Sequence, residues 1–365
     1  MKTEANTQSS KIENQNSNQK HLNRLKIVAV VFTLLGVALF GYFVYSVGLE
    51  EILAGIARIG FGGFLIILLL YFLRITVRAC AWKLCVSEPY KLDLRDTLPA
   101  VIMGEALSSL IPLGILVSGT AKAVAVKKRV PLVIGLSSVA TENLFYSLVT
   151  GLFLCFGAFA FLHSFELGEG WIATINFLIG VICSLISLGV LVVVRQWRWA
   201  SSLSNWLYNR NFGKRFLETG RAQVRQFEDL IYGFYREYPR RFLPIVLLQV
   251  AYHVIGITEV WFVLSRISAV FPSLYSSFLL ESMSRLITIV FKLIPFLIGV
   301  DEAGARFVTE ILALGAGVGV TLAIIRKGRI LFWTAIGLIL IIKREFSLRE
   351  INNVVGRSEE LGVES

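Results

Sequence analysis

The stretch FKLIPFLIGVDEAGARF, residues 291–307, decides the fold of this chain, because it is apolar overall and yet carries charges beside helix-breaking residues. Its charged residues are Lys292, Asp301, Glu302 and Arg306. A charge at the centre of a membrane helix costs about 2.5–3.5 kcal/mol, and proline and glycine interrupt helices. We interpret the stretch as a broken membrane segment whose charges face a polar cavity.

The composition is that of a polytopic membrane protein. The chain has 365 residues, of which 55% are hydrophobic and 17% charged. Apolar runs of about 20 residues, enough to cross a hydrocarbon core of about 30 Å, recur along it. We predict six full spans, near residues 27–47, 63–82, 132–161, 171–194, 242–265 and 318–342.

Two further apolar stretches, 98–126 and 275–316, are predicted to be re-entrant helical hairpins, because proline and glycine break both of them. The breaking residues are Pro112, Gly114 and Gly119 in the first, and Pro295, Gly299 and Gly304 in the second. Non-helical backbone is tolerated at membrane depth only where protein or a water-filled cavity satisfies it. The two hairpins therefore predict a polar cavity near the middle of the membrane.

The two broken stretches resemble each other. SLIPLGILVSGTAKAVAV (109–126) and KLIPFLIGVDEAGARFVT (292–309) share Leu-Ile-Pro, a glycine, small residues and then a cation, Lys122 or Arg306. Their identity is low, so a chance match is the alternative. Three predicted spans separate them, so they would enter from opposite sides, as in inverted-repeat transporters. The expected fold is an all-α polytopic membrane protein with about six transmembrane helices and two opposed re-entrant hairpins.

The predicted organisation has a membrane domain at 27–342 between two cytoplasmic tails, 1–26 and 343–365. Lysine and arginine are frequent in the first tail, the turn 127–129 and the loop 195–241. This distribution predicts that these regions and both termini lie on the cytoplasmic side of the cell membrane. Residues 210–236 of the loop have helical amphipathic spacing. We expect this segment to contact anionic lipids of the inner leaflet; a solvated connector is the alternative. The net charge of +11 is attributed to orientation and lipid, not to nucleic acid.

Charged residues in the apolar segments are the candidate functional residues. They are Arg74, Arg78, Glu105, Glu142, Glu281, Arg285, Lys292, Asp301, Glu302, Arg306, Arg326 and Arg329. Glu142 lies deep in its predicted span, so we expect it to be a buried partner for one of the arginines. Arg326 and Arg329 are expected to be counter-ions of Asp301 and Glu302. For Arg74 and Arg78, extension to the headgroups and contact with substrate both remain open.

The chain resembles the lysylphosphatidylglycerol synthase transmembrane-region family, also called flippase-like membrane proteins. In IPFLIGVDEAGARF the family pattern is matched by Pro295, Gly299 and Glu302. Arg329, or less closely Arg326, matches the arginine of the last span, and LRITVRACAWKL (73–84) is similar to an arginine-and-tryptophan segment through Arg78 and Trp82. The chain departs from the family at Thr120, where an acid is usual, and at Asn143, where an arginine is usual.

The resemblance implies a lipid translocase that moves an anionic, aminoacylated or glycosylated lipid between leaflets. About 23 residues follow the last predicted span, too few for the aminoacyltransferase domain of the fused family members. A membrane-embedded lipid-modifying enzyme and a non-transporting scaffold for lipid synthesis are the alternatives. We expect no enzymatic activity, and a homo-oligomer is left open.

Each predicted site residue has one of two expected roles. The residues expected to contact the lipid headgroup are Lys122, Arg285, Arg306 and Arg78. Those expected to line or gate the cavity are Glu302, Arg329, Glu142, Pro112, Gly119, Pro295 and Gly299. No metal or cofactor is expected, because the histidines at 21, 163 and 253 are far apart and the cysteines at 80, 85, 155 and 183 are interpreted as core residues.

Overall fold

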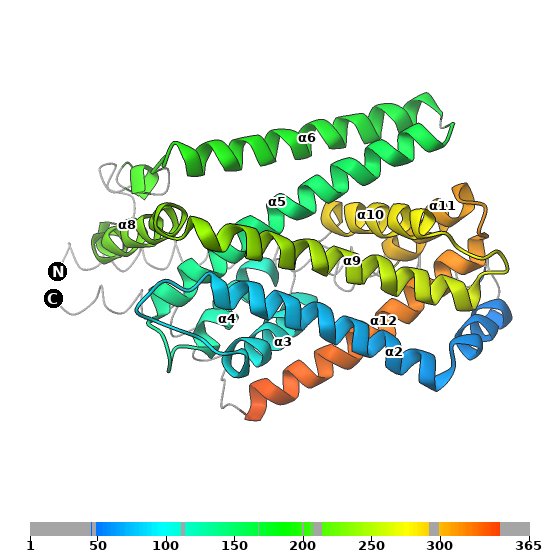
Figure 1. Cartoon of the computed structure of the whole chain (residues 1–365), viewed down its shortest axis with the longest axis horizontal. Coiled ribbons are helices and arrows are strands. Elements are labelled where there is room, and N and C mark those ends of the chain that lie inside the picture. The colour runs from blue at the N-terminus through cyan, green and yellow to red at the C-terminus, as the bar shows by residue number, and fades with distance from the viewer. Residues whose placement is uncertain are drawn as a thin grey trace, which may run out of the picture.

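The computed structural model is helical throughout the part of the chain that it describes (Figure 1). The described residues are 45, 49–110, 114–166, 168–198, 201–204, 206, 214–291 and 299–343. The all-α prediction is confirmed. The predicted span 27–47, both tails, Pro112, Lys292 and Pro295 lie outside the described residues.

Four long helices have the length and apolar composition needed to cross a membrane. They are Leu53–Leu84 within α2 (Leu49–Leu84), Leu132–Ser164 (α5), Glu169–Val194 (α6), and Pro239–Ile267, which joins the short 3-10 helix η1 (Pro239–Arg241) to α9 (Phe242–Ile267). They correspond to four of the predicted spans, so the chain is a multi-pass membrane protein. A further predicted span, 318–342, corresponds to α12 (Ala316–Lys343), which is 28 residues long but is not one of the four helices with the length and apolar composition to cross a membrane. Its interior carries Arg326, Lys327 and Arg329.

The helix α2 starts earlier than the predicted span 63–82. The predicted spans 27–47 and 63–82 leave residues 48–62 as a connection, but the structure has helix from Leu49, with a kink at Gly60 where φ is 61° and ψ is 178°. Only glycine adopts such a conformation without strain. The prediction missed this first helical segment because it placed a connection at Glu50 and Glu51.

Two pairs of short helices replace full spans in the stretches that proline and glycine interrupt. The first pair is α3 (Leu94–Leu110) and α4 (Gly114–Ala125); the second is α10 (Leu274–Val290) and α11 (Val300–Ile311). Each pair has one helix of 17 residues and one of 12, about 25 Å and 18 Å long. Each helix is shorter than a hydrocarbon core of about 30 Å. The two helices of each pair pack against one another.

The pairs lie toward opposite ends of the bundle. In Figure 1, α3 and α4 follow the end of α2, whereas α10 and α11 follow the end of α9 on the other side of the molecule. The helix α12 packs against both α3 and α11. A Cβ atom on Gly319 would lie 2.5 Å from the carbonyl carbon of Ala305 in α11, and one on Gly337 would lie 2.4 Å from Cβ of Ala106 in α3. Glycine thus brings α12 close to both pairs.

The helix α8 (Lys214–Glu237) lies within the loop that was expected to hold an amphipathic segment. Its Ile231 and Phe234 are buried, and Phe234 packs in a cluster with Phe145 of α5 and Ile245 of α9. The C-terminal half of its apolar face is therefore covered by protein.

The cysteines are not all core residues as predicted: Cys85 is buried, Cys80 and Cys155 are half-buried and Cys183 is exposed. The sulfur atoms of Cys155 in α5 and Cys183 in α6 are 3.6 Å apart. We expect copper phenanthroline to join them, because thiols in contact need only small rotations to form a disulfide. Mass spectrometry of a digest should detect the linked peptides. Cys183→Ser is the control, and unlinked cysteines after full oxidation would contradict the packing of α5 on α6.

Candidate functional site

The interior of the bundle contains a group of buried charged side chains, which we call the central cluster. Its members are Arg74 from α2, Glu259 from α9, Glu281 and Arg285 from α10, and Arg326 and Arg329 from α12. The cluster therefore joins one of the short helices to three long ones. Five of the six residues are buried, and Arg285 is half-buried with 18% of its side chain exposed.

Glu281 is the centre of this cluster, because three guanidinium groups converge on its carboxylate. Its Oε1 accepts hydrogen bonds from Nη2 of Arg74 at 3.3 Å and from Nη2 of Arg285 at 2.9 Å. Its Oε2 accepts from Nη2 of Arg326 at 2.7 Å. A buried charge is tolerated when it is paired and hydrogen-bonded in this way.

Glu259 links the remaining arginine to the cluster. It forms a direct ion pair with Arg329, and its Oε2 lies 3.7 Å from Nη1 of Arg74. Four guanidinium groups thus share two carboxylates within ion-pair distance, so positive charge exceeds negative charge by two among these six described residues. An excess of buried positive charge favours the binding of an anion.

Tyrosines surround the guanidinium groups of the cluster. The guanidinium carbon of Arg74 lies 4.3 Å from the ring centre of Tyr252, and that of Arg329 lies 4.2 Å from the ring centre of Tyr71. Nη1 of Arg285 donates to the hydroxyl oxygen of Tyr252 at 3.3 Å. These cation–π contacts hold the guanidinium groups in place without adding negative charge.

A second group of charges, which we call the α3 cluster, consists of Arg78, Glu105 and Glu142. Arg78 donates from Nη1 to Glu105 at 2.8 Å, from Nε to Glu142 at 3.1 Å and from Nη2 to Asn143 Oδ1 at 3.1 Å. Gln249 of α9 also donates to Glu142, at 3.2 Å. The prediction that Glu142 is the buried partner of an arginine is confirmed.

A third group, the α11 cluster, lies at the start of α11 and consists of Asp301, Glu302 and Lys327. Nζ of Lys327 lies 2.6 Å from Oε1 of Glu302 and 3.8 Å from Oδ2 of Asp301. The prediction that Arg326 and Arg329 are the counter-ions of these acids is wrong, because both arginines point to the central cluster. The lysine between them on α12 takes that role.

Glu302 also caps the N-terminus of α11. Its Oε2 accepts the backbone N–H of Gly299 at 2.8 Å, and Gly299 is the N-cap residue of α11 with φ of 83°. A glutamate three residues after the N-cap commonly accepts this N–H, and a positive φ favours glycine. The two residues thus start α11 together, and Glu302 is completely buried.

The remaining predicted site residues are distributed as follows. Lys122 is buried. A Cβ atom on Gly104 of α3 would lie 2.9 Å from Cγ of Lys122, so glycine leaves room for the lysine side chain. Arg306 forms an ion pair with Glu310 at 2.9 Å, and its side chain is 29% exposed, more than any cation of the three clusters. A Cβ atom on Gly119 would lie 3.6 Å from Cγ1 of Val139 in α5, an ordinary contact distance.

Sequence reasoning missed Glu259 and Lys327. Both lie in predicted spans, 242–265 and 318–342, so the search for charges in apolar segments could have found them. For Arg74 and Arg78 the sequence left two interpretations, extension to the lipid headgroups or contact with a substrate. The structure places both arginines in interior ion pairs. No sequence signal marks Tyr71 or Tyr252, because an aromatic residue is common anywhere in a membrane helix.

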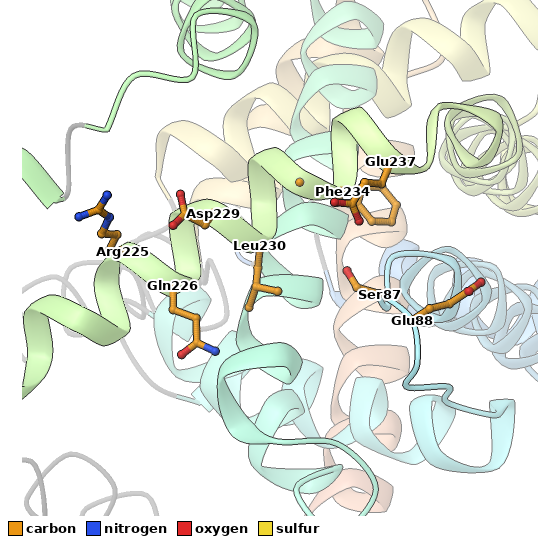
Figure 2. Close-up of a pocket in the computed structure, with 9 residues that line it drawn as sticks. Ser87, Glu88, Arg225, Gln226, Asp229, Leu230, Phe234 and Glu237 are labelled. Carbon is orange, nitrogen blue, oxygen red and sulfur yellow. The ribbon is translucent and has the colours of Figure 1, made fainter.

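A separate pocket of about 470 Å³ lies outside these clusters, between α8 and the connection from α2 to α3 (Figure 2). Figure 2 shows Ser87 and Glu88 on the connection after α2, Gln226 and Leu230 pointing down from α8, and Arg225 and Asp229 pointing to the opposite side of that helix. Two of its three acids already have close partners: Glu88 pairs with Arg241 and Asp229 with Arg198, each at 2.9 Å. The three buried clusters, rather than this pocket, are the candidate functional site.

Comparison with known proteins places the chain in a family. Residues 26–338 match the sequence profile described as the lysylphosphatidylglycerol synthase TM region. No curated protein and no solved structure gives a significant match. The match covers most of the chain and agrees with the resemblance in residues 294–307. The chain therefore belongs to the lysylphosphatidylglycerol synthase transmembrane-region family.

Proposed function

We propose that this protein is a lipid translocase of the flippase-like type, which moves a lipid with an anionic headgroup between leaflets. The observation that carries the proposal is the central cluster, where four arginines, three of them buried, share two carboxylates. Membership of a family of membrane proteins involved in lipid handling supports it. Intramembrane charges are costly and usually mark a substrate pathway.

The two pairs of short helices support an inverted-repeat mechanism. Both pairs have helices of 17 and 12 residues, and they lie toward opposite ends of the bundle (Figure 1). In this proposal both pairs are re-entrant and meet near the midplane, where transporters place their substrate sites. Rocking of one pair relative to the other would expose the central cluster to each leaflet in turn.

We assign the proposed roles of the cationic residues by how exposed their side chains are. Arg285 and Arg78 are the most exposed guanidinium groups of the buried clusters, so they contact the headgroup first. Arg306, which is more exposed, lies on the entry route, and Lys122 provides a deeper positive charge. Glu302 and Arg329 control the gate between α11 and α12.

The proposed orientation places both termini in the cytoplasm and the protein in the cell membrane. The basic loop 195–241 then faces the anionic inner leaflet, as the distribution of lysine and arginine suggests.

Translocation in proteoliposomes tests the proposal. We expect the wild-type protein to move fluorescent phosphatidylglycerol between leaflets, and Arg285→Gln to slow this movement at least about tenfold, equivalent to about 1.4 kcal/mol. Arg306→Ala and Glu302→Ala are also expected to slow it. Arg236→Gln is the matched control, because the Arg236 side chain in α8 is 74% exposed.

Two results would contradict the proposal. The first is a wild-type rate equal to that of empty liposomes under all lipid compositions tested. The second is chemical conversion of the recovered lipid, seen by chromatography, which would favour the enzyme alternative. If all folded variants translocate at the wild-type rate, the residue roles are wrong.

A further inference from the structure

The carboxylate of Glu281 occupies a place that is built for an anion. Three guanidinium groups from three helices, α2, α10 and α12, meet on its two oxygens. Resting on the proposed function, we infer that Glu281 is an internal anion that fills the phosphate site of the lipid headgroup when no lipid is bound. The lipid phosphate then displaces Glu281 to enter.

The arrangement of the donors favours this interpretation. Arginine binds carboxylate and phosphate through the same planar fork of N–H groups, so a site that fits one also accepts the other. Arg74 and Arg326 reach the carboxylate from two other helices, α2 and α12, whereas Arg285 comes from α10 itself, one turn after Glu281. Of the three arginines that contact Glu281, Arg285 alone lies on the same helix, so a movement of α10 withdraws the carboxylate from the other two arginines.

The backbone of α9 is shaped to let the carboxylate and Arg74 lie close to it. A Cβ atom on Gly256 would lie 2.8 Å from Oε1 of Glu281 and 3.1 Å from Cζ of Arg74. Glycine leaves the anion position open, and any other residue there would displace one of the two groups. Tyr252, one turn earlier, contacts both Arg74 and Arg285.

The central cluster keeps an excess of positive charge even when Glu281 occupies the anion position. With Glu281 in place, the six described residues of the central cluster still carry two more positive than negative charges. A phosphate diester that replaces Glu281 gives the arginines the same single negative charge, while the released carboxylate must find water or another cation. Glu281 therefore competes with the ligand and weakens its apparent affinity.

Anion rescue of a Glu281→Gln variant tests this inference. In detergent and in chloride buffer, we expect the variant to unfold at a lower temperature than the wild type, because three arginines lose the carboxylate of Glu281 and only Arg74 keeps Glu259 within ion-pair distance among the described residues. Inorganic phosphate, or phosphatidylglycerol added to the micelles, should restore the unfolding temperature. The apparent affinity for the added anion should be at least tenfold tighter than in the wild type.

Glu310→Gln is the matched control, since the same change removes a carboxylate that pairs with the exposed Arg306. It should show no rescue. If Glu281→Gln does not fold, Glu281→Asp takes its place: the shorter carboxylate cannot reach all three arginines, and we expect phosphate to bind at least threefold more tightly than to the wild type. Rescue by phosphatidylglycerol alone would identify a lipid site, and rescue by both anions a general phosphate site; either result supports the inference.

Two results separate this inference from the proposed function. If the wild type translocates lipid but neither anion rescues or binds more tightly to the Glu281 variants, Glu281 is only a structural counter-ion and the inference is wrong. If rescue occurs but the wild type moves no lipid, the anion site stands and the translocase proposal fails.

Discussion

Replacing Lys327 by methionine is expected to lower the free energy of unfolding by about 3–5 kcal/mol, the usual cost of removing one partner of a buried ion pair. Lys327 is the described cation within ion-pair distance of Glu302 and Asp301. Without it, no described residue supplies a counter-charge to Glu302, whose side chain is completely buried. Chemical unfolding in detergent, followed by tryptophan fluorescence, measures the loss.

The double variant Lys327→Met with Glu302→Gln should recover a large part of this loss. Glutamine keeps an oxygen that can accept the N–H of Gly299 and removes the unpaired negative charge. The control is Lys83→Met, which breaks a pair with Asp93 at the surface and should cost less than about 1 kcal/mol. Equal effects of the Lys327 and Lys83 variants would show that the α11 cluster does not stabilise the fold.

Gly319→Ala is expected to destabilise the protein by about 1–3 kcal/mol, because the added methyl group has no space between α11 and α12. Its Cβ would lie 2.5 Å from the carbonyl carbon and oxygen of Ala305 and 2.5 Å from Oγ1 of Thr309. Backbone atoms cannot rotate away as a flexible side chain can, so α11 must move as a whole. The unfolding temperature in detergent and the translocation rate should both fall.

Gly180→Ala in α6 is the matched control, since a Cβ at that position meets no atom within 4 Å. Alanine has a higher helix propensity than glycine, so this variant should be as stable as the wild type or slightly more stable. A Gly319→Ala protein with wild-type unfolding temperature would show that α11 and α12 are not packed as closely as the structure has them.

The sequence predicted the helical membrane class, four of the spans and the positions where two helices break. These features depend on local properties: hydropathy over about 20 residues determines a span, and proline or glycine interrupts a helix wherever it lies. The family also followed from a local motif around Pro295, Gly299 and Glu302. The same criterion, charges within apolar segments, located most of the buried clusters.

The partners of those charges could not be predicted from the sequence. Arg326, Lys327 and Arg329 are neighbours in one helix, and each successive residue turns by about 100° around its axis. Which of them faces α11 therefore depends on the rotation of α12, which close packing at Gly319 and Gly337 determines. Arg74 and Glu281 are 207 residues apart in the chain and meet only because α2 and α10 approach each other in the bundle.

The sequence by itself thus determined that this protein is a multi-pass helical membrane protein with two broken segments and many charges inside the membrane, because hydropathy and helix breaking act over short distances. Only the tertiary structure decided that four arginines share Glu259 and Glu281, and that Lys327 binds Glu302. An ion pair requires two side chains within about 4 Å, and helix rotation and packing set that distance.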